Sequence, residues 1–223
     1  MHQAVQHNLE LETEASSTPR NSTYNYNPIT GVQYANKYVK NNNTAFHYFT
    51  SGGNCTNFVS QCIWAAYGGW SSSDSHNTIV NNIAARRRMM PSTTLSNWFG
   101  HGNGAGNPWS STTNLWNFVT GNPAVGPKAT GSNNNAVYTG VSPAVINQGN
   151  VLQFRNGSSG SYSHSVYVIN TIPIHVLPPA YGNITVAQNT PDTTRLLSES
   201  INGFGGSNCH MRRLAFTSAV FSS

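Results

Sequence analysis

Apolar side chains at helical spacing follow the first proline-containing segment of the folded region. Ile29, Val32 and Val39 are separated by three and seven residues, which places them on one side of a helix. A proline at the start of such a pattern and a run of asparagines at its end are typical helix boundaries. The sequence therefore predicts a helix that begins near Pro28 and ends at residues 41–43.

A second apolar face begins at a cysteine and ends at two glycines. This face starts at Phe58 and continues one, four, five and eight positions later, at Val59, Cys62, Ile63 and Ala66. Cys55 lies four residues before Val59, so it belongs to the same face and to the first turn. Gly68-Gly69 stops the pattern. We predict a buried helix with a cysteine at its N-terminus.

The last third of the chain changes to β-branched runs with turn residues between them. Four runs are predicted to be strands, at residues 149–154, 164–170, 183–189 and 212–218. Strands that follow helices, rather than alternating with them, indicate an α+β domain with an antiparallel sheet. Residues 115–119 between these regions predict one or two helical turns.

Residues 70–145 are rich in Ser, Asn, Gly and Trp and show little periodicity. We expect one domain over residues 24–223, with this Trp-rich stretch as an insertion and residues 1–23 as a polar linker or pro-segment stub. Trp side chains in polar loops either line a groove or cover the edge of a core. Both alternatives stay open here, and Trp109 is a candidate for substrate binding.

Composition narrows the surroundings in which this chain works. Only 8% of its 223 residues are charged, against about 25% in a typical soluble domain. Such a weakly ionic polar surface suits a secreted or cell-wall associated protein. The formal net charge is +5, but the basic runs at Arg86-Arg87-Arg88 and Arg212-Arg213 lack regularly spaced aromatic residues, so nucleic-acid binding is not expected. No apolar run approaches the ~20 residues of a membrane span.

Three cysteines, Cys55, Cys62 and Cys209, leave at least one thiol unpaired. They form no CxxC pair, and we expect neither a metal nor an organic cofactor. Cys62 falls on the apolar helix face; whether it pairs with Cys209 is open. Cys55 follows the Gly52-Gly53-Asn54 turn and opens a helix, where unsatisfied N–H groups lower the pKa of a thiol and can hold an oxyanion.

A cysteine nucleophile needs a base and a residue that orients it. His164 begins a predicted strand and shares one strand face with Val166 and Val168, so we expect its imidazole to point toward the helix. His76 and His101 lie in Ser-rich and Gly-rich loops and are weaker candidates. Asn189, at the end of the next strand, is expected as the third member, with Asp192 as the alternative. The chain order Cys, His, Asn is that of papain-like enzymes.

The local sequence around Cys55 identifies a family far more specifically than the chain order of these three residues. GGNCTNFVSQCIWAAYGGW (52–70) closely resembles the GG-D-C-TNFVSQ signature of the bacterial putative amidase domain family, which belongs to the papain-like, NlpC/P60-like cysteine hydrolases. Similar stretches follow through most of the chain: YNYNPITGVQYANKYV, SNWFG, NPWSSTTNLWNFV, GNVLQF with SHSVYVIN, and AQNTPDTTRLL. The resemblance implies a nucleophile helix packed on an antiparallel sheet.

Carried over by position, the resemblance implies Cys55 as nucleophile, His164 as base and Asn189 as third member. The chain departs from the family pattern where Asn54 and Asn150 stand in place of Asp and where Asn189 stands in place of His. Within the signature, Asn54 is a further candidate near the oxyanion. Asn57 and Gln61 either contact substrate or oxyanion, or are buried amides that hold neighbouring loops.

The implied activity is hydrolysis of an amide or peptide bond through a thioester, with bacterial cell-wall peptide or peptidoglycan as the substrate and a monomer as the working form. Two alternatives share the fold. One is a weakly active or inactive module that binds cell wall or glycan, and the other is a secreted protease or deamidase that acts on a protein.

Overall fold

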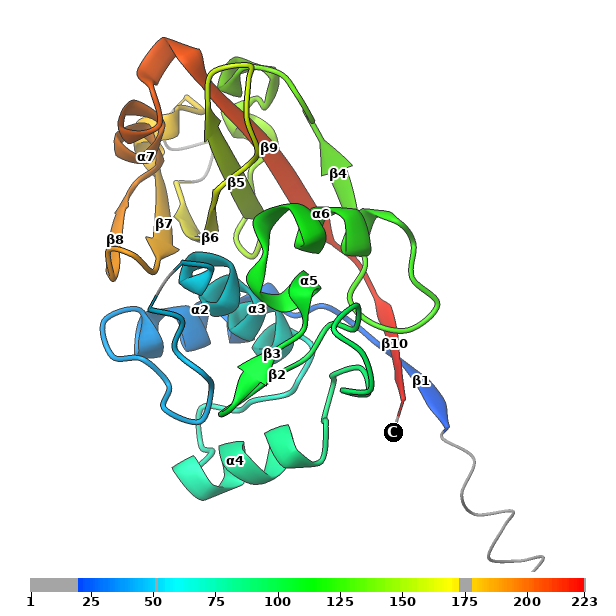
Figure 1. Cartoon of the computed structure of the whole chain (residues 1–223). Coiled ribbons are helices and arrows are strands. Elements are labelled where there is room, and N and C mark those ends of the chain that lie inside the picture. The colour runs from blue at the N-terminus through cyan, green and yellow to red at the C-terminus, as the bar shows by residue number, and fades with distance from the viewer. Residues whose placement is uncertain (1–19, 51, 173–177, 223) are drawn as a thin grey trace, which may run out of the picture.

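The structure is a computed structural model that describes residues 20–50, 52–172 and 178–222. It has the α+β architecture predicted from the sequence, with most helices before the strands and with antiparallel sheets (Figure 1). The helices are α2 (Pro28–Tyr38), α3 (Asn54–Ala66), α4 (His76–Ala84), α5 (Asn107–Ser110), α6 (Thr112–Thr120) and α7 (Leu197–Gly203). The papain-like topology stays a prediction.

The main sheet has six antiparallel strands in the order β4-β9-β5-β6-β7-β8. Their bounds are β4 (Ala129–Ser132), β5 (Val151–Asn156), β6 (His164–Thr171), β7 (Ile184–Gln188), β8 (Thr193–Leu196) and β9 (Cys209–Phe216). The strands β5, β6, β7 and β9 coincide with the four predicted runs. A short hairpin joins β2 (Gly100–His101) to β3 (Gly104–Ala105).

A further two-stranded sheet pairs β1 (Asn21–Tyr24) with β10 (Ala219–Ser222). Three residues of β1 fall in the segment expected to be a linker, so the folded part begins earlier than the sequence pattern indicates. Four residues paired with a distant strand give no local hydrophobic period. Residues 1–19 of the expected linker lie outside the described residues.

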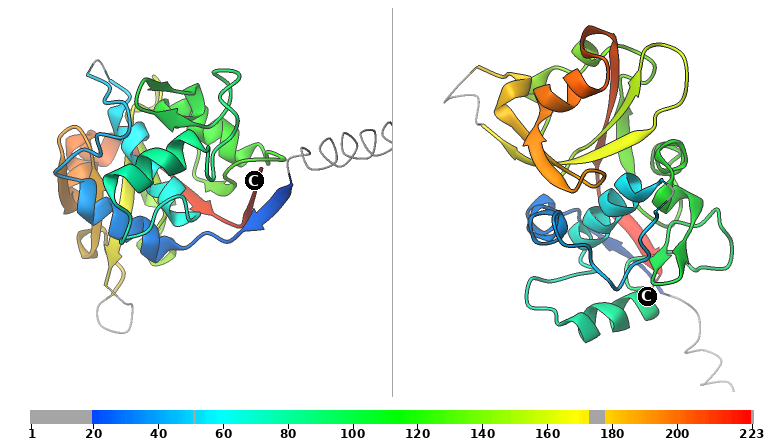
Figure 2. Two further views of the ribbon diagram at one scale, coloured as in Figure 1. Left: turned by 90° about the horizontal axis from the view of Figure 1, so that it is seen from below. Right: turned by 60° about the vertical axis from the view of Figure 1, so that its left-hand side comes forward.

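Two hydrophobic clusters lie on opposite faces of the main sheet. One joins α2, α3 and the Trp-rich region to the strand residues Val151, Tyr167 and Leu214. The other lies beneath α7 and contains Val166 and Val168. Figure 2 shows α7 with the sheet in one part of the molecule and α2 and α3 in the other part.

The Trp-rich region contributes core rather than a separate insertion. Trp98 and Trp109 are fully buried, and their ring centroids lie 4.5 Å apart. Ser75 and Ser111 cap α4 and α6 by accepting hydrogen bonds from backbone N–H groups. These helices are short and packed by residues distant in sequence, which explains why the region shows so little periodicity.

Candidate active site

Cys55 lies in the first turn of α3, as the sequence predicts. The helix begins after Gly53, whose φ of 83° is left-handed, and no side chain of the described residues caps this end. The first backbone bond of the helix is donated by Asn57 N to Gly53 O at 3.0 Å. The N–H groups of Asn54, Cys55 and Thr56 precede that bond, and they are the unsatisfied donors of a helix N-terminus. This end of α3 is suited to bind negative charge.

The backbone at residue 53 requires glycine for two reasons. Its φ lies in the region that L side chains rarely adopt, and a Cβ there would stand 2.9 Å from Ser110 O. The turn therefore packs closely on α5 and delivers Cys55 to a defined place. Cys55 is 6% exposed, and its Sγ lies 3.9 Å from Ser163 O and 3.8 Å from Thr56 Oγ1.

His164 is the first residue of β6 and directly follows Ser163, the residue whose carbonyl contacts the thiol. Its ring stacks on Phe204 with centroids 5.1 Å apart. Its Nε2 is buried and has no hydrogen-bond partner among the described residues, and no hydrogen bond between the imidazole and Cys55 is found there.

Burial is the main cause that lowers the pKa of His164, to about 4. The nearby Gln188 side chain acts in the opposite direction, and the Arg195 charge adds to the lowering. The imidazole is therefore neutral at neutral pH, which is the form that can accept a proton.

The orientation of β6 differs from the expected one. His164 does share a face with Val166 and Val168, but those valines pack beneath α7 and not against α3. Ser165 and Tyr167 face α3 instead, with Ser165 Oγ 3.1 Å from Thr56 Oγ1. Both faces of β6 are buried, so the alternation shows which residues share a face but not which helix that face meets.

Asn189 lies directly after β7 and is fully buried. Its Oδ1 accepts a hydrogen bond from Asn54 Nδ2, and its Nδ2 donates to Asn42 Oδ1 at 3.1 Å. These bonds tie the end of β7 to the start of α3. Asn54 and Asn189, two of the three asparagines at which the chain departs from the family pattern, thus meet in space. Asp192, the alternative third member, accepts a hydrogen bond from Thr190 N in its own turn.

The imidazole has a neighbour that the sequence analysis missed, Gln188. Gln188 is 2% exposed and precedes Asn189, so it falls on the face of β7 opposite to it. Alternation along β7 places Gln188 on the same face as Ile184 and Val186. These two residues lie in the cluster beneath α7, which also holds the apolar residues on the face of His164, so this alternation is the sequence signal for Gln188.

The other candidates of the signature hold segments around α3. Asn57 Nδ2 donates to His47 O at 2.9 Å and to Asn54 Oδ1 at 3.0 Å, and Asn57 Oδ1 accepts from Trp109 Nε1 at 2.8 Å. Gln61 Oε1 accepts from Tyr34 OH at 2.7 Å. Trp109 is fully buried, which excludes sugar stacking on its ring in this conformation. The buried-amide alternative describes what Asn57 and Gln61 do here.

Cys55, Cys62 and Cys209 are all free thiols. Cys62 and Cys209 belong to the two different hydrophobic clusters, so no disulfide joins them. Burial raises the pKa of Cys62 well above its ordinary value and that of Cys209 to about 11. Both are poor thiolate formers at neutral pH, which leaves Cys55 as the candidate nucleophile.

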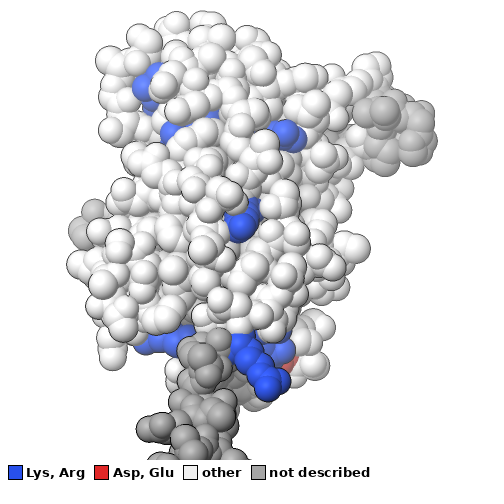
Figure 3. All heavy atoms as spheres, turned by 90° about the vertical axis from the view of Figure 1, so that its right-hand side faces the viewer, with Lys and Arg blue, Asp and Glu red and all other residues white. Residues whose placement is uncertain are grey.

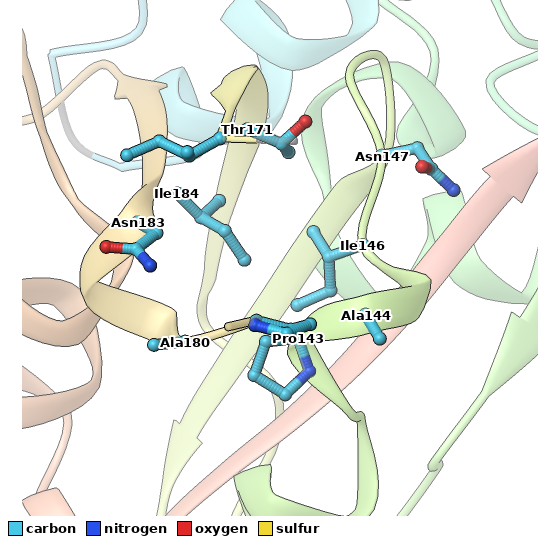
Figure 4. Close-up of a pocket in the computed structure, with 10 residues that line it drawn as sticks. Pro143, Ala144, Ile146, Asn147, Thr171, Ala180, Asn183 and Ile184 are labelled. Carbon is cyan, nitrogen blue, oxygen red and sulfur yellow. The ribbon is translucent and has the colours of Figure 1, made fainter. Parts of the chain in front are cut away.

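A hollow of about 300 Å³ opens elsewhere, between β6, β7 and the 3₁₀ turn at 143–145 (Figure 4). It is lined by Thr171, the last residue of β6, whereas His164 is the first. The hollow therefore lies at the end of the strand away from Cys55. On the face in Figure 3, Lys and Arg form separate spots over most of the surface and gather only at its lower edge.

The described residues offer neither a cluster of metal-binding side chains nor a membrane-spanning helix. No group of three or more His, Cys, Asp or Glu side chains is arranged there to hold a metal ion. None of the helices in the same ranges has the length and apolar character needed to cross a bilayer.

Fold and site together define an α+β domain built around a cysteine at the N-terminus of a buried helix. A family model described as a putative amidase domain matches residues 25–212, and the chain belongs to that family. Membership indicates amide hydrolysis at a general level. No match was found among curated proteins or among solved structures.

Proposed function

We propose that this chain is a papain-like, cysteine-dependent hydrolase that cleaves an amide or peptide bond, with Cys55 as nucleophile and His164 as base. The carrying observation is the position of Cys55. It lies in the uncapped first turn of a buried helix, with its Sγ 3.9 Å from the carbonyl that immediately precedes His164.

The reaction begins with proton transfer from the Cys55 thiol to the neutral imidazole of His164. The transfer needs an imidazole nitrogen within about 3 Å of Sγ, so the His164 ring, which packs on Phe204 on the α7 face, must turn toward Cys55 when substrate binds. The free Nε2 and the backbone contact at Ser163 support this step. The thiolate then adds to the carbonyl carbon of the substrate.

The oxyanion formed by this addition lies at the N-terminus of α3. Backbone N–H groups of Asn54, Cys55 and Thr56 point there and stabilise the charge as it develops. His164 returns its proton to the departing amine, and the C–N bond breaks. Water, deprotonated by His164, hydrolyses the remaining thioester and regenerates the thiol.

Orientation of the base is assigned to Gln188 in this proposal. Its side chain lies near the imidazole on the neighbouring strand and raises its pKa. Asn189 acts at one remove, because its bond with Asn54 fixes the turn that carries Cys55. The amide that orients the histidine and the amide that holds the nucleophile helix are then consecutive residues on opposite faces of one strand end.

The proposed substrate is peptide in bacterial cell wall, acted on by a secreted or wall-associated monomer. Family membership supports the bond type. The weakly charged surface and the net charge of +5 support work on an anionic wall outside the cell.

The test compares wild type with Cys55→Ala on purified peptidoglycan, with product masses identifying the cleaved bond. We expect loss of product by about 10³-fold or more in Cys55→Ala. Cys209→Ala is the matched control, because it removes a buried thiol from the opposite face of the sheet and should keep full activity. Equal product from wild type and Cys55→Ala would remove Cys55 from the mechanism, and no product from either would favour the wall-binding module.

A further inference from the structure

Two arginines are buried side by side near the candidate nucleophile. Arg155 on β5 is 9% exposed and Arg212 on β9 is 4% exposed. They belong to paired strands, where Gln153 is opposite Arg212 and Arg155 is opposite His210. The face that carries them also bears Ser165, which contacts Thr56 next to Cys55.

Neutral groups surround the Arg212 guanidinium. Its Nε donates to Gln153 Oε1 at 2.8 Å, Nη1 to Asn134 Oδ1 at 2.9 Å and Nη2 to Thr112 O at 3.4 Å. Two aromatic rings also lie near the guanidinium, Trp116 with its centroid at 4.3 Å and Tyr162 at 3.8 Å. Burial lowers the pKa of Arg212 to about 10, so it stays charged at neutral pH.

The guanidinium of Arg155 has fewer hydrogen-bond partners than that of Arg212. Its Nη1 donates to Gly160 O at 3.0 Å, and its Nη2 lies 3.3 Å from His210 Nδ1. Burial, followed by the Arg155 charge, lowers the pKa of His210, so its neutral ring can accept this bond. The Nε of Arg155 is buried and has no hydrogen-bond partner among the described residues. Nε and Nη2 form the edge of a guanidinium that binds carboxylates with two parallel hydrogen bonds.

The negative charge that buried cations need is missing from the described residues around these arginines. The three acidic side chains in the described ranges each accept a hydrogen bond from backbone N–H groups of their own segments: Asp74 from Ser71, Asp192 from Thr190 and Glu199 from Leu196. Burying a cation without an anion is unfavourable, because neutral acceptors replace its hydration only in part. A pair of such cations is therefore a place where an anionic group gains free energy by binding.

This positive charge adjoins the candidate reaction centre. The Tyr162 ring lies near both guanidinium groups, with its centroid 5.0 Å from Arg155 Cζ. Tyr162 is followed by Ser163, whose carbonyl contacts Cys55 Sγ, and then by His164. The segment that meets the thiol and the base is thus the same segment that packs on the two arginines.

We propose that Arg155, supported by Arg212 and His210, binds a carboxylate that the substrate carries close to the scissile amide. The substrate class is then an acidic peptide rather than a neutral one. This inference rests on the proposed function and deepens it, because it adds a specificity site to the same catalytic centre. Arg155 is the contacting residue, since its Nε–H is free, and Arg212 holds Tyr162 and adds charge behind it.

The experiment uses stem peptides released from purified peptidoglycan, tested as free acids and after carbodiimide coupling with methylamine, which converts carboxylates to neutral N-methylamides. Wild type should hydrolyse the acids with a kcat/KM about 10- to 100-fold higher, mainly through a lower KM. Arg155→Gln should lose this preference. Arg87→Gln removes an exposed arginine and changes the net charge by the same amount. This control variant should keep the preference for the acids.

Equal kcat/KM of wild type for acids and methylamides would overturn the inference while leaving the amidase function intact. A preference that persists in folded Arg155→Gln would also overturn it. If neither peptide set is cleaved, the proposed function fails, and calorimetry with Cys55→Ala then decides the inference. Tighter binding of the acids would support the carboxylate site, and equal or absent binding would contradict it. Both wild-type comparisons stand even if Arg155→Gln does not fold.

Discussion

The face of the main sheet that meets α3 combines apolar packing with a network of hydrogen bonds between buried side chains, whereas the opposite face packs mainly apolar side chains beneath α7. On the first face, Thr56 Oγ1 lies 2.9 Å from Thr112 Oγ1 and 3.1 Å from Ser165 Oγ, and Gln153 bonds to Arg212. On the second face, the cluster consists of apolar side chains such as Leu152, Val166 and Val168.

The contrast places the two proposed catalytic residues in different environments. Cys55 lies at a helix N-terminus, whose N–H groups can stabilise the negative charge of an oxyanion. His164 lies among aromatic rings on the apolar side, which favours a neutral imidazole. The end of β6 is where the two environments meet. Four tests of this difference between the two faces follow, in order of expected free-energy effect.

The largest effect is expected from removing the base on the apolar face. His164→Gln should lower kcat/KM for the cleaved peptide by about 10³-fold or more, equivalent to about 4 kcal/mol of transition-state stabilisation. His76→Gln changes an exposed histidine on α4 and should leave kcat/KM unchanged. Steady-state kinetics with both variants makes the measurement. A His164→Gln enzyme within tenfold of wild type would remove His164 from the mechanism.

Acid should destabilise the apolar face next. The pKa of His164 is about 4 in the folded chain, against about 6.5 when unfolded. Between these values the unfolded chain binds more protons, so stability is full above pH 6.5 and falls as the pH drops through 4. The loss attributable to His164 is about 3 kcal/mol. Urea unfolding at pH 7 and pH 4 measures it, and His164→Gln should show a correspondingly smaller acid loss.

The hydrogen-bonded face is tested by neighbouring residues of β5 that point to opposite sides. Gln153→Leu leaves Arg212 Nε without its partner, removes one of the two hydrogen bonds that Thr112 O accepts, and should lower the free energy of unfolding by about 2 kcal/mol. Leu152→Met keeps volume and polarity on the apolar face and should cost less than ~1.5 kcal/mol. Chemical denaturation compares the two. A larger loss for Leu152→Met would contradict the division of the faces.

The same division shows what the sequence could predict. Helical periodicity, a proline start and a glycine stop were sufficient for α2 and α3, and β-branched runs located β5, β6, β7 and β9. The position of Cys55, the proposed nucleophile, at a helix start followed from the same periodicity. These are local properties, so they are readable from neighbouring residues.

Long-range properties were not readable in this way. Both faces of β6 are buried, so alternation pairs His164 with Val166 but does not say which helix they meet. The choice between Gln188 and Asn189 depends on that unknown face. Arg155 and Arg212 are 57 positions apart in the sequence. They come together only because β5 pairs with β9 in the folded sheet. Trp98 and Trp109 pack together for the same non-local reason.

The smallest effect separates two adjacent amides on opposite faces of β7. Gln188→Leu removes the polar side chain that raises the pKa of His164, so that pKa should fall further below about 4 and kcat should fall about tenfold, or about 1.4 kcal/mol. Asn189→Leu should instead weaken the start of α3 through Asn54 and leave the titration of His164 unchanged. NMR titration of the imidazole reads out this difference directly, because a purely structural loss does not move it. If Asn189→Leu shifts the His164 titration and Gln188→Leu does not, the orienting role belongs to Asn189, and the α3 face supplies the whole triad.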